Sequence, residues 1–145
     1  MIIIKRLNLV FQENSYDCGL ACLLMIARYY NCNVPKDYLE NVSMTMKDGT
    51  SMYGLMRAMI SLGFDACGKE GNVNDLDKSS LPLIAHIKLN EERALYHYVV
   101  VTNITNKKIT IKDPSRGTKT MLKDDFSKLA TGNYLFVKKT AKLKR

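Results

Sequence analysis

The sequence predicts an α+β fold, in which a helical N-terminal half packs on a C-terminal antiparallel sheet. Two observations support this prediction. Between residues 18 and 62 the apolar residues follow helical spacing, whereas from residue 83 onward β-branched and aromatic residues alternate with Asn, Asp and Gly turn signals. Helices first and strands second are typical of α+β domains. With 145 residues, 46% of them hydrophobic, the chain suffices for one domain with a single core.

The helical half begins after a turn-forming cluster, Asn-Ser-Tyr-Asp, at residues 14–17. The following stretch, 18–30, is apolar on all sides, which is typical of a helix in the middle of a domain. A second short helix is expected at 34–40, with Pro35 near its first turn. Residues 52–62 then form an amphipathic helix that ends before a glycine.

The second half of the chain predicts a sheet. A short strand at 64–67 precedes it, and a short helix is expected at 123–129. The main strands are predicted from β-branched and aromatic runs at 83–88, 96–104, 108–113, 118–122 and 134–138.

Hydropathy and charge exclude several classes of protein. The longest apolar run, 20–27, is far shorter than the roughly 20 residues of a membrane-spanning helix, and the N-terminus does not resemble a signal peptide. The net charge is +8, but five positive charges lie in the tail 138–145. A nucleic-acid partner is not expected, because such binders place basic residues on a folded face among aromatic residues. The tail is either a solvated end or a segment that precedes a membrane region.

The cysteines do not indicate a metal site. Cys18, Cys22, Cys32 and Cys67 include no C-x-x-C pair, and a chain with a sizeable core does not need disulfides. We expect four reduced thiols, a cytosolic setting, and neither metal nor cofactor. Cys22 lies within the apolar run and is expected in the core.

Cys18 is the candidate nucleophile. It follows the turn cluster and so lies at the N-terminus of the central helix, where free N–H groups and the helix dipole stabilise a thiolate and lower the pKa of the thiol. Gly19 would let another backbone or a ligand approach closely. Gln12 could place its amide beside the Cys18 N–H, and two such donors form an oxyanion hole. The alternative is a buried thiol with an unrelated surface glutamine.

His97 and Asp113 are the candidate partners of this cysteine. Each lies eight residues from Thr105, so a hairpin centred there places them opposite one another, with Cβ atoms about 5 Å apart. In that geometry a carboxylate orients an imidazole. The alternative is a charged pair at the edge of a hairpin. His86 has no such partner and is expected to be structural.

Together, Gln12, the block Asp17-Cys18-Gly19-Leu20-Ala21-Cys22, His97-Tyr98-Val99-Val100 and Asp113-Pro114 resemble the C39 peptidase family over essentially the whole chain. Members are N-terminal peptidase domains of ABC transporters that export bacteriocins and lanthipeptides. The resemblance implies a papain-like cysteine peptidase that cleaves leader peptides after a Gly-Gly-type pair. It also implies that Cys18 is the nucleophile, His97 the general base and acid, Asp113 the residue that orients His97, and Gln12 the oxyanion donor.

The same resemblance implies a context for the domain. Residues 1–137 would be the peptidase domain, and 138–145 a basic tail that leads to an absent membrane domain. Transmembrane helices and an ATPase domain would follow, on the cytoplasmic side of the cell membrane. No G-x-x-x-x-G-K-[ST] phosphate loop occurs in these residues, so an excised domain or natural fragment without ATP binding or membrane insertion is expected.

Two other functions remain open. One is a different Cys-His-Asp enzyme, such as a transglutaminase-like or acyltransferase domain; Gln12 favours the peptidase. The other is a non-catalytic docking domain that holds a peptide for export.

The leader itself is expected to arrive as an amphipathic helix ending in Gly-Gly. A stripe at helical spacing, Met52, Leu55, Met56 and Met59, is the candidate surface for it, because methionine adapts to varied apolar partners. The alternative is that this stripe packs on the central helix.

Overall fold

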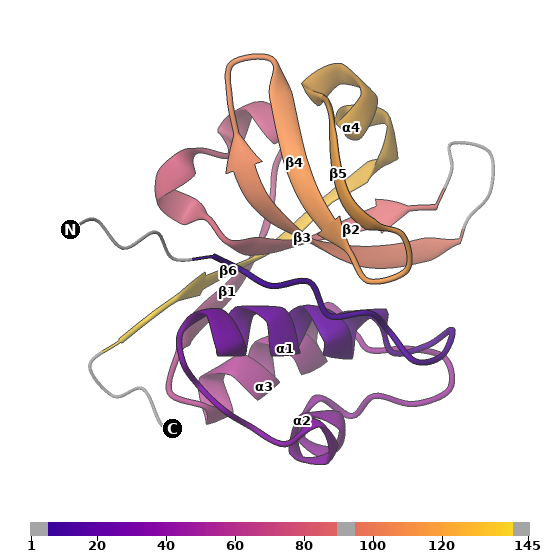
Figure 1. Ribbon diagram of the computed structural model, residues 1–145, viewed down its shortest axis with the longest axis vertical. Coiled ribbons are helices and arrows are strands. Elements are labelled where there is room, and N and C mark those ends of the chain that lie inside the picture. Colours follow the sequence, from indigo (N-terminus) through magenta and orange to yellow (C-terminus); the bar gives the residue numbers. More distant parts are fainter. Residues whose placement is uncertain (1–5, 90–94, 141–145) are drawn as a thin grey trace.

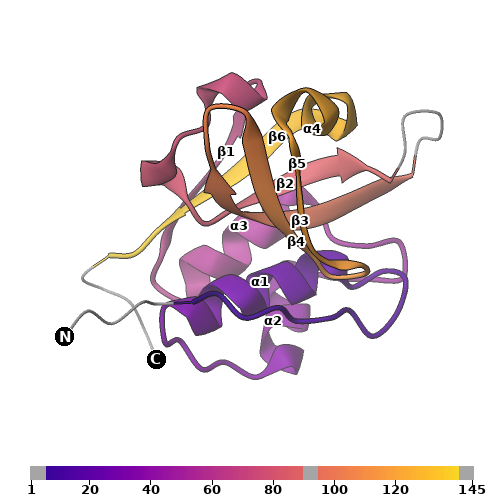
Figure 2. The same ribbon diagram turned by 45° about the horizontal axis from the view of Figure 1, so that its top comes forward.

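The computed structural model describes residues 6–89 and 95–140, which fold into a helical layer and a sheet layer (Figure 1). Three helices gather on one side of the sheet, and a fourth covers part of the other side (Figures 1 and 2). The predicted α+β class is confirmed. The helices are α1 (Cys18–Tyr29), α2 (Lys36–Ser43), α3 (Met52–Ser61) and α4 (Lys123–Leu129).

The sheet has six strands in the order β1-β6-β2-β3-β4-β5, and every neighbouring pair is antiparallel. The last strand lies between the first two, an arrangement that local sequence does not predict. Two strands are longer than expected: β1 continues beyond residue 67 and β6 begins before residue 134. The strands are β1 (Asp65–Glu70), β2 (Leu83–Lys88), β3 (Tyr96–Ile104), β4 (Lys108–Asp113), β5 (Gly117–Leu122) and β6 (Ala130–Lys138).

Apolar side chains fill both faces of the sheet. On one face α1 packs against β3, and all residues of α1 from Gly19 to Ala27 are buried, as its all-round apolar sequence predicts. On the other face Phe126 of α4 is fully buried with residues of β3 and β4. β3 is therefore covered on both sides, which explains why its buried part, residues 97–101, is almost continuously apolar.

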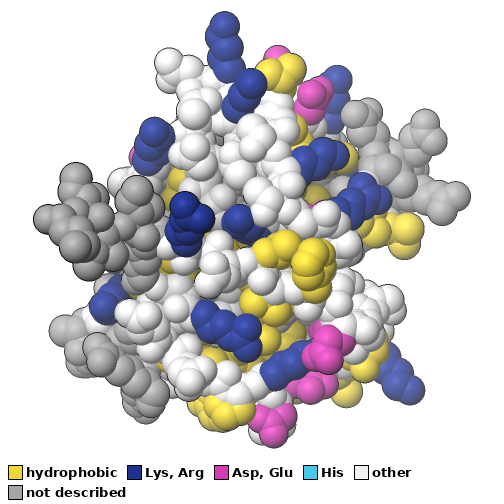
Figure 3. Space-filling view, in the orientation of Figure 1, with side chains coloured by type: hydrophobic (Ala, Val, Ile, Leu, Met, Phe, Trp, Pro, Cys, Tyr) yellow, Lys and Arg dark blue, Asp and Glu magenta, His cyan; other side chains and the backbone are white. Residues whose placement is uncertain are grey.

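The connection from β1 to β2 contains two short 3₁₀ turns, η1 (Val73–Asp75) and η2 (Lys78–Ser80). Among the described residues, no helix is long and apolar enough to cross a membrane. Basic side chains are spread over the helical and sheet halves of the face in Figure 3, with fewer acidic ones. The tail's last five residues, 141–145, lie outside the described residues.

Candidate active site

Cys18 is the first residue of α1 and is only partly buried. The first backbone bond of α1 runs from the N–H of Ala21 to the carbonyl of Asp17 (3.0 Å). The N–H groups of the first turn, including that of Cys18, therefore have no acceptor within the helix, and the positive end of the helix dipole faces the thiol. Cys18 therefore lies at the N-terminus of the central helix, the position that the turn cluster at residues 14–17 predicts.

A buried ion pair faces this cysteine. Nε2 of His97 on β3 lies 2.7 Å from Oδ1 of Asp113 at the end of β4, and both residues are buried. Cys18 lies close enough to His97 that it acts, together with Asp113, to raise the pKa of the imidazole. Because Nε2 is occupied by Asp113, Nδ1 is the ring nitrogen left for Cys18. The structure thus brings the three predicted residues into one chain of contacts.

The strand register that brings His97 and Asp113 together differs from the prediction. The turn lies between Thr105 and Lys108, and a bulge at Thr102 shifts the pairing between β3 and β4. Val100 pairs with Lys112, so the residue across from Asp113 is Val99 rather than His97. The expected direct opposition is therefore wrong. His97 lies two residues before Val99, and side chains two residues apart share a face of a strand. His97 is therefore the diagonal neighbour of Asp113 on that face, and its side chain is long enough to reach the carboxylate.

His97 and Asp113 are both held in their charged forms. Burial alone would lower the pKa of His97, but the hydrogen bonds and negative charges of Asp113 and Cys18 outweigh it and raise this pKa to about 9. For Asp113, burial acts to raise the pKa, but the bond and charge of His97 and two bonds from Ser115 lower it to about 2. An imidazolium with a fixed carboxylate is therefore the stable state at neutral pH.

Gln12 is held at the end of β4 by its backbone, whose N–H donates to the carbonyl of Pro114 (2.9 Å). Its side-chain Nε2 donates one hydrogen to the carbonyl of Asn14 (2.7 Å). Oε1 is buried with no hydrogen-bond partner in the part of the chain that the structure describes. The Gln12 side chain thus lies on a loop whose backbone is bonded to the Asp113–Pro114 segment.

Asp17 has a role that the sequence did not indicate. It occupies the N-cap position of α1, but its carboxylate makes no capping bond. It turns back instead and accepts hydrogen bonds from the N–H groups of Glu13 and Asn14, at 3.1–3.3 Å. It also forms an ion pair with Nζ of Lys36 on α2 (3.0 Å). Burial acts to raise the pKa of Asp17, but these bonds lower it overall. Asp17 thus fixes the loop that carries Gln12.

Gly19 permits close packing within the protein. A Cβ at this position would lie 3.0 Å from Cδ2 of Leu55 and 3.2 Å from Cδ2 of Tyr98. The expected close approach is therefore that of α3 and β3 to α1, and no ligand is needed to explain this glycine.

The predicted methionine stripe is divided by burial. Leu55 and Met59 are fully buried in the core between α1 and α3, so the expected continuous surface does not exist. Met52 and Met56 are partly exposed at its edge. For Leu55 and Met59, packing on the central helix is the correct interpretation.

A cavity of about 420 Å³ lies at the start of α3, and Met52, His86 and Tyr98 are among the residues that line it. His86 lies between two tyrosine rings: it stacks on Tyr96 with ring centroids 5.1 Å apart and packs against Tyr98 at 5.0 Å. Because Tyr98 also contacts Gly19, this cavity adjoins the Cys18 end of α1. Sequence analysis missed the cavity, since its lining comes from α3 and several strands.

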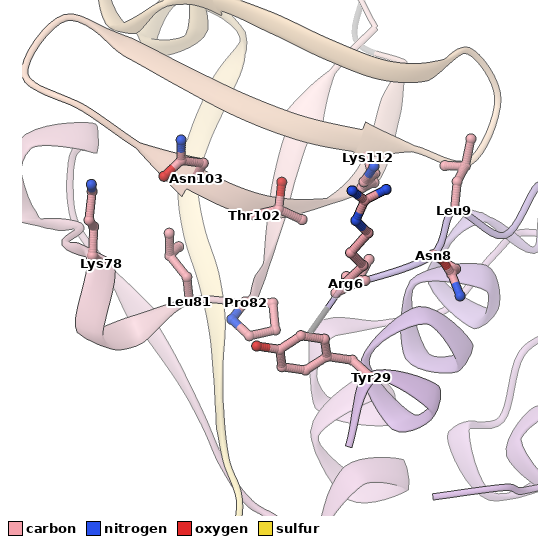
Figure 4. Close-up of a pocket in the computed structure, with 11 residues that line it drawn as sticks. Arg6, Asn8, Leu9, Tyr29, Lys78, Leu81, Pro82, Thr102, Asn103 and Lys112 are labelled. Carbon is pink, nitrogen blue, oxygen red and sulfur yellow. The ribbon is translucent and has the colours of Figure 1, made fainter. Parts of the chain in front are cut away.

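A second cavity, of about 550 Å³, lies elsewhere (Figure 4). Arg6, Lys78 and Lys112 surround it, and Tyr29 at the C-terminal end of α1 lines it. Twelve helical residues separate the ends of α1 by about 16 Å, so this cavity is distant from Cys18. Within residues 6–89 and 95–140, no cluster of His, Cys, Asp or Glu could hold a metal ion.

None of the four cysteines, all of which the structure describes, forms a disulfide, and Cys22 lies in the core as predicted. Burial raises the pKa of Cys22 well above its usual value, and the charges of Cys18 and Asp113 add to the effect. Cys32 is also buried, and its pKa is raised by burial. Neither buried thiol is suited to act as a nucleophile.

A cysteine at the start of a central helix, facing a His–Asp pair on an antiparallel sheet, defines the papain-like class of cysteine peptidases. The family model of the peptidase C39 family matches residues 6–142, and the chain belongs to this family. The predicted family and peptidase class are confirmed.

Similar proteins agree with this assignment. The chain is 38% identical over 139 residues to the lactococcin-G-processing and transport ATP-binding protein LagD of Lactococcus lactis subsp. lactis, covering 94% of this chain and 20% of LagD. It thus spans about a fifth of the length of that relative.

Two solved structures share the fold. One is a double glycine motif protease from an AMS/PCAT transporter in complex with the leader peptide, with a TM-score of 0.83, 26% identity and 94% of each chain covered. The other is the peptidase domain of Streptococcus ComA, a bi-functional ABC transporter involved in a quorum sensing pathway. Its TM-score is 0.81 and its identity 31%, over 93% of this chain and 100% of that chain.

Proposed function

We propose that this C39 peptidase removes the leader peptide from bacteriocin- or lanthipeptide-type precursors by cutting after a Gly-Gly-type pair. The observation that carries the proposal is the buried His97–Asp113 pair, 2.7 Å apart, beside Cys18 at the N-terminus of α1. The LagD name and the complex of the double glycine motif protease with a leader peptide support the substrate class.

The roles of the residues follow from their contacts. Sγ of Cys18 attacks the carbonyl carbon of the scissile bond, and the Gln12 amide and the Cys18 N–H stabilise the oxyanion. His97 donates a proton to the leaving amine, which releases the mature peptide and leaves the leader as a thioester. His97 then accepts a proton from the water that hydrolyses this thioester. Asp113 keeps the imidazole oriented throughout.

The test is to incubate the protein with the precursor peptide encoded beside it and to measure fragment masses. Wild type should give two fragments cut after the Gly-Gly pair, and Cys18→Ala should give none while it still folds and binds the leader. Binding without cleavage by wild type would indicate a docking domain. Acyl transfer or ammonia release would instead indicate a transglutaminase-like enzyme.

For the leader, we propose that the cavity lined by Met52, His86 and Tyr98 accepts an apolar side chain upstream of the cut. It adjoins the Cys18 end of α1, and Met52 is the partly exposed residue of the predicted stripe that lines it. Recognition must extend beyond the two glycines, since glycines offer no side chain to distinguish one peptide from another.

Met52→Asp should raise the Michaelis constant for the full precursor strongly, because a carboxylate in place of the Met52 side chain opposes burial of an apolar side chain beside it. Turnover of a short Gly-Gly peptide should be nearly unchanged. Ile60→Asp, which alters an exposed residue (49%) near the other end of α3, is the matched control. Loss of folding in Met52→Asp alone would place Met52 among the core residues.

We also propose that the peptidase works beside the transmembrane and ATPase domains of a transporter, on the cytoplasmic side of the membrane. The name of LagD, which combines processing, transport and ATP binding, supports this context. Residues 138–145 would then join the peptidase domain, 1–137, to the membrane part, with their positive charges toward anionic lipid headgroups.

A further inference from the structure

A hydroxyl from the β4–β5 turn joins the His97–Asp113 pair. Oγ of Ser115 lies 2.8 Å from Oδ1 of Asp113 and 3.4 Å from Nε2 of His97. Oδ1 is also the oxygen that His97 contacts, at 2.7 Å. The three atoms therefore form a triangle. Ser115 is exposed, whereas His97 and Asp113 are buried, so the hydroxyl lies on the solvent side of the ion pair.

The backbone of Ser115 and its side chain act differently. The Ser115 N–H donates to Oδ1 of Asp113 (2.8 Å), a bond common where an Asp begins a turn. The turn itself is closed by the bond from the Arg116 N–H to the Asp113 carbonyl (3.2 Å). These backbone bonds are available to any residue except proline at position 115, so the hydroxyl is an addition that the turn does not require.

The direction of the hydroxyl dipole matters. Since a carboxylate only accepts hydrogen bonds, the hydroxyl must donate its hydrogen to Oδ1 of Asp113. Its oxygen, the negative end of the dipole, then faces the protonated Nε2 of His97. The hydroxyl is thus oriented favourably toward both charges at once, and it favours the carboxylate of Asp113 as well as the imidazolium of His97.

We propose that Ser115 is a positioning residue of this active site, whose hydroxyl bridges Asp113 and His97 and extends the pH range in which His97 stays protonated and aimed at Cys18. The activity part of this inference rests on the proposed peptidase function. The effect of Ser115 on the protonation of His97 does not depend on that function, because it concerns only the charge state of His97.

The other groups that face the pair are few. Cys18 from α1 acts on His97, and Cys22, one helical turn further, faces Asp113. Among residues 6–89 and 95–140, Asp113 and Cys18 are the titratable groups that raise the pKa of His97. The effect of Ser115 on His97 is therefore best measured in a variant that lacks the Cys18 thiol.

The first experiment compares kcat/KM against pH for wild type, Ser115→Ala and Ser115→Thr. In Ser115→Ala the alkaline limb should move to lower pH by about half a unit, and kcat should fall roughly three- to tenfold, the net effect expected for the loss of one ordinary hydrogen bond. Ser115→Thr keeps the hydroxyl and should restore both values. Ser127→Ala removes an exposed hydroxyl that bonds only the local carbonyl of Asp124, and it should change neither.

The second experiment follows the His97 ring by NMR titration in Cys18→Ala and in Cys18→Ala with Ser115→Ala. The pKa of His97 should be lower in the double variant. This measurement needs no cleavage, so it distinguishes failure of the inference from failure of the proposed function. An unchanged pKa of His97, or a Ser115→Ala enzyme with the pH profile of wild type, would overturn the inference and leave Ser115 as a turn residue.

Discussion

At the scale of single residues, the site depends on a few polar groups that have defined partners. His97 and Asp113 lie 2.7 Å apart in a buried setting, so each stabilises the charge of the other. Gln12 is anchored through its backbone to Pro114, directly after Asp113. The proposed oxyanion donor, Gln12, and the residue proposed to orient the imidazole, Asp113, are thereby held by one short segment, and we expect their positions to be coupled.

Gln12→Ala tests the oxyanion role. Turnover should fall by roughly 10²–10³, the usual range for loss of one such donor, because the amide acts on charge that develops only in the transition state. Leader affinity should hardly change. Steady-state kinetics with the precursor measure both quantities, and Asn8→Ala, which removes an exposed amide from the same N-terminal segment, is the control. A large rise in KM at constant kcat would make Gln12 a binding residue.

At the scale of elements, the start of α1 is organised by a carboxylate that faces away from the helix. Asp17 holds the N–H groups of Glu13 and Asn14 and pairs with Lys36, so it joins the Gln12 loop, α1 and α2. Lys36 bonds Glu13 as well. The loop geometry needed by Gln12 therefore depends on a contact between two helices.

Removal of the Lys36 cation should destabilise the loop that carries Gln12. In Lys36→Met the buried carboxylate of Asp17 keeps its two backbone donors but loses its counter-ion, which should lower the free energy of unfolding by about 1–3 kcal/mol. Urea unfolding at neutral pH measures the loss, and kcat should fall with little change in KM. Lys47→Met, at an exposed lysine outside α2, provides the comparison. Equal stability of the two variants would show that the ion pair contributes nothing.

At the scale of the whole molecule, the ion pair links stability to pH. The pKa of His97 is raised to about 9, from an ordinary value of 6.5, so the folded state binds more protons than the unfolded state between these two values. The stabilisation is complete below pH 6.5 and is lost as the pH rises toward 9. Asp113, with its pKa lowered to about 2, contributes at all pH values above its ordinary 3.8.

We therefore expect the free energy of unfolding to fall between pH 6.5 and 8, by at most about 1.4 kcal/mol per pH unit. The upper limit of pH 8 matters because the raised pKa values of Cys22 and Cys32 add a loss of the same sign at higher pH. Urea unfolding at several pH values gives the slope.

The histidine variants provide the controls for this slope. His97→Asn should remove most of it. His86→Asn should not, since burial lowers the pKa of His86, and its linkage therefore acts below pH 6.5. A slope that persists in His97→Asn would assign the effect to other groups.

Local sequence pattern was enough to predict most helices and strands and the reactive residues at their ends. Helical spacing predicted α1 and α3, alternation predicted most strands, and a cysteine after a turn cluster predicted the N-terminus of α1. These features depend on neighbours within a few residues, so local pattern is enough to predict them. The spacing of His97 and Asp113 indicated that they meet, since both face the same side of one hairpin.

Contacts between residues of different elements could not be predicted in this way. The insertion of β6 between β1 and β2, the bulge that makes His97 and Asp113 diagonal, and the division of the methionine stripe into core and edge all depend on packing between distant segments. The same is true of Asp17, whose partner Lys36 lies on α2. The physical reason is that register and burial are set by the combined fit of all packed elements, whereas a local pattern specifies only which face of one element is apolar.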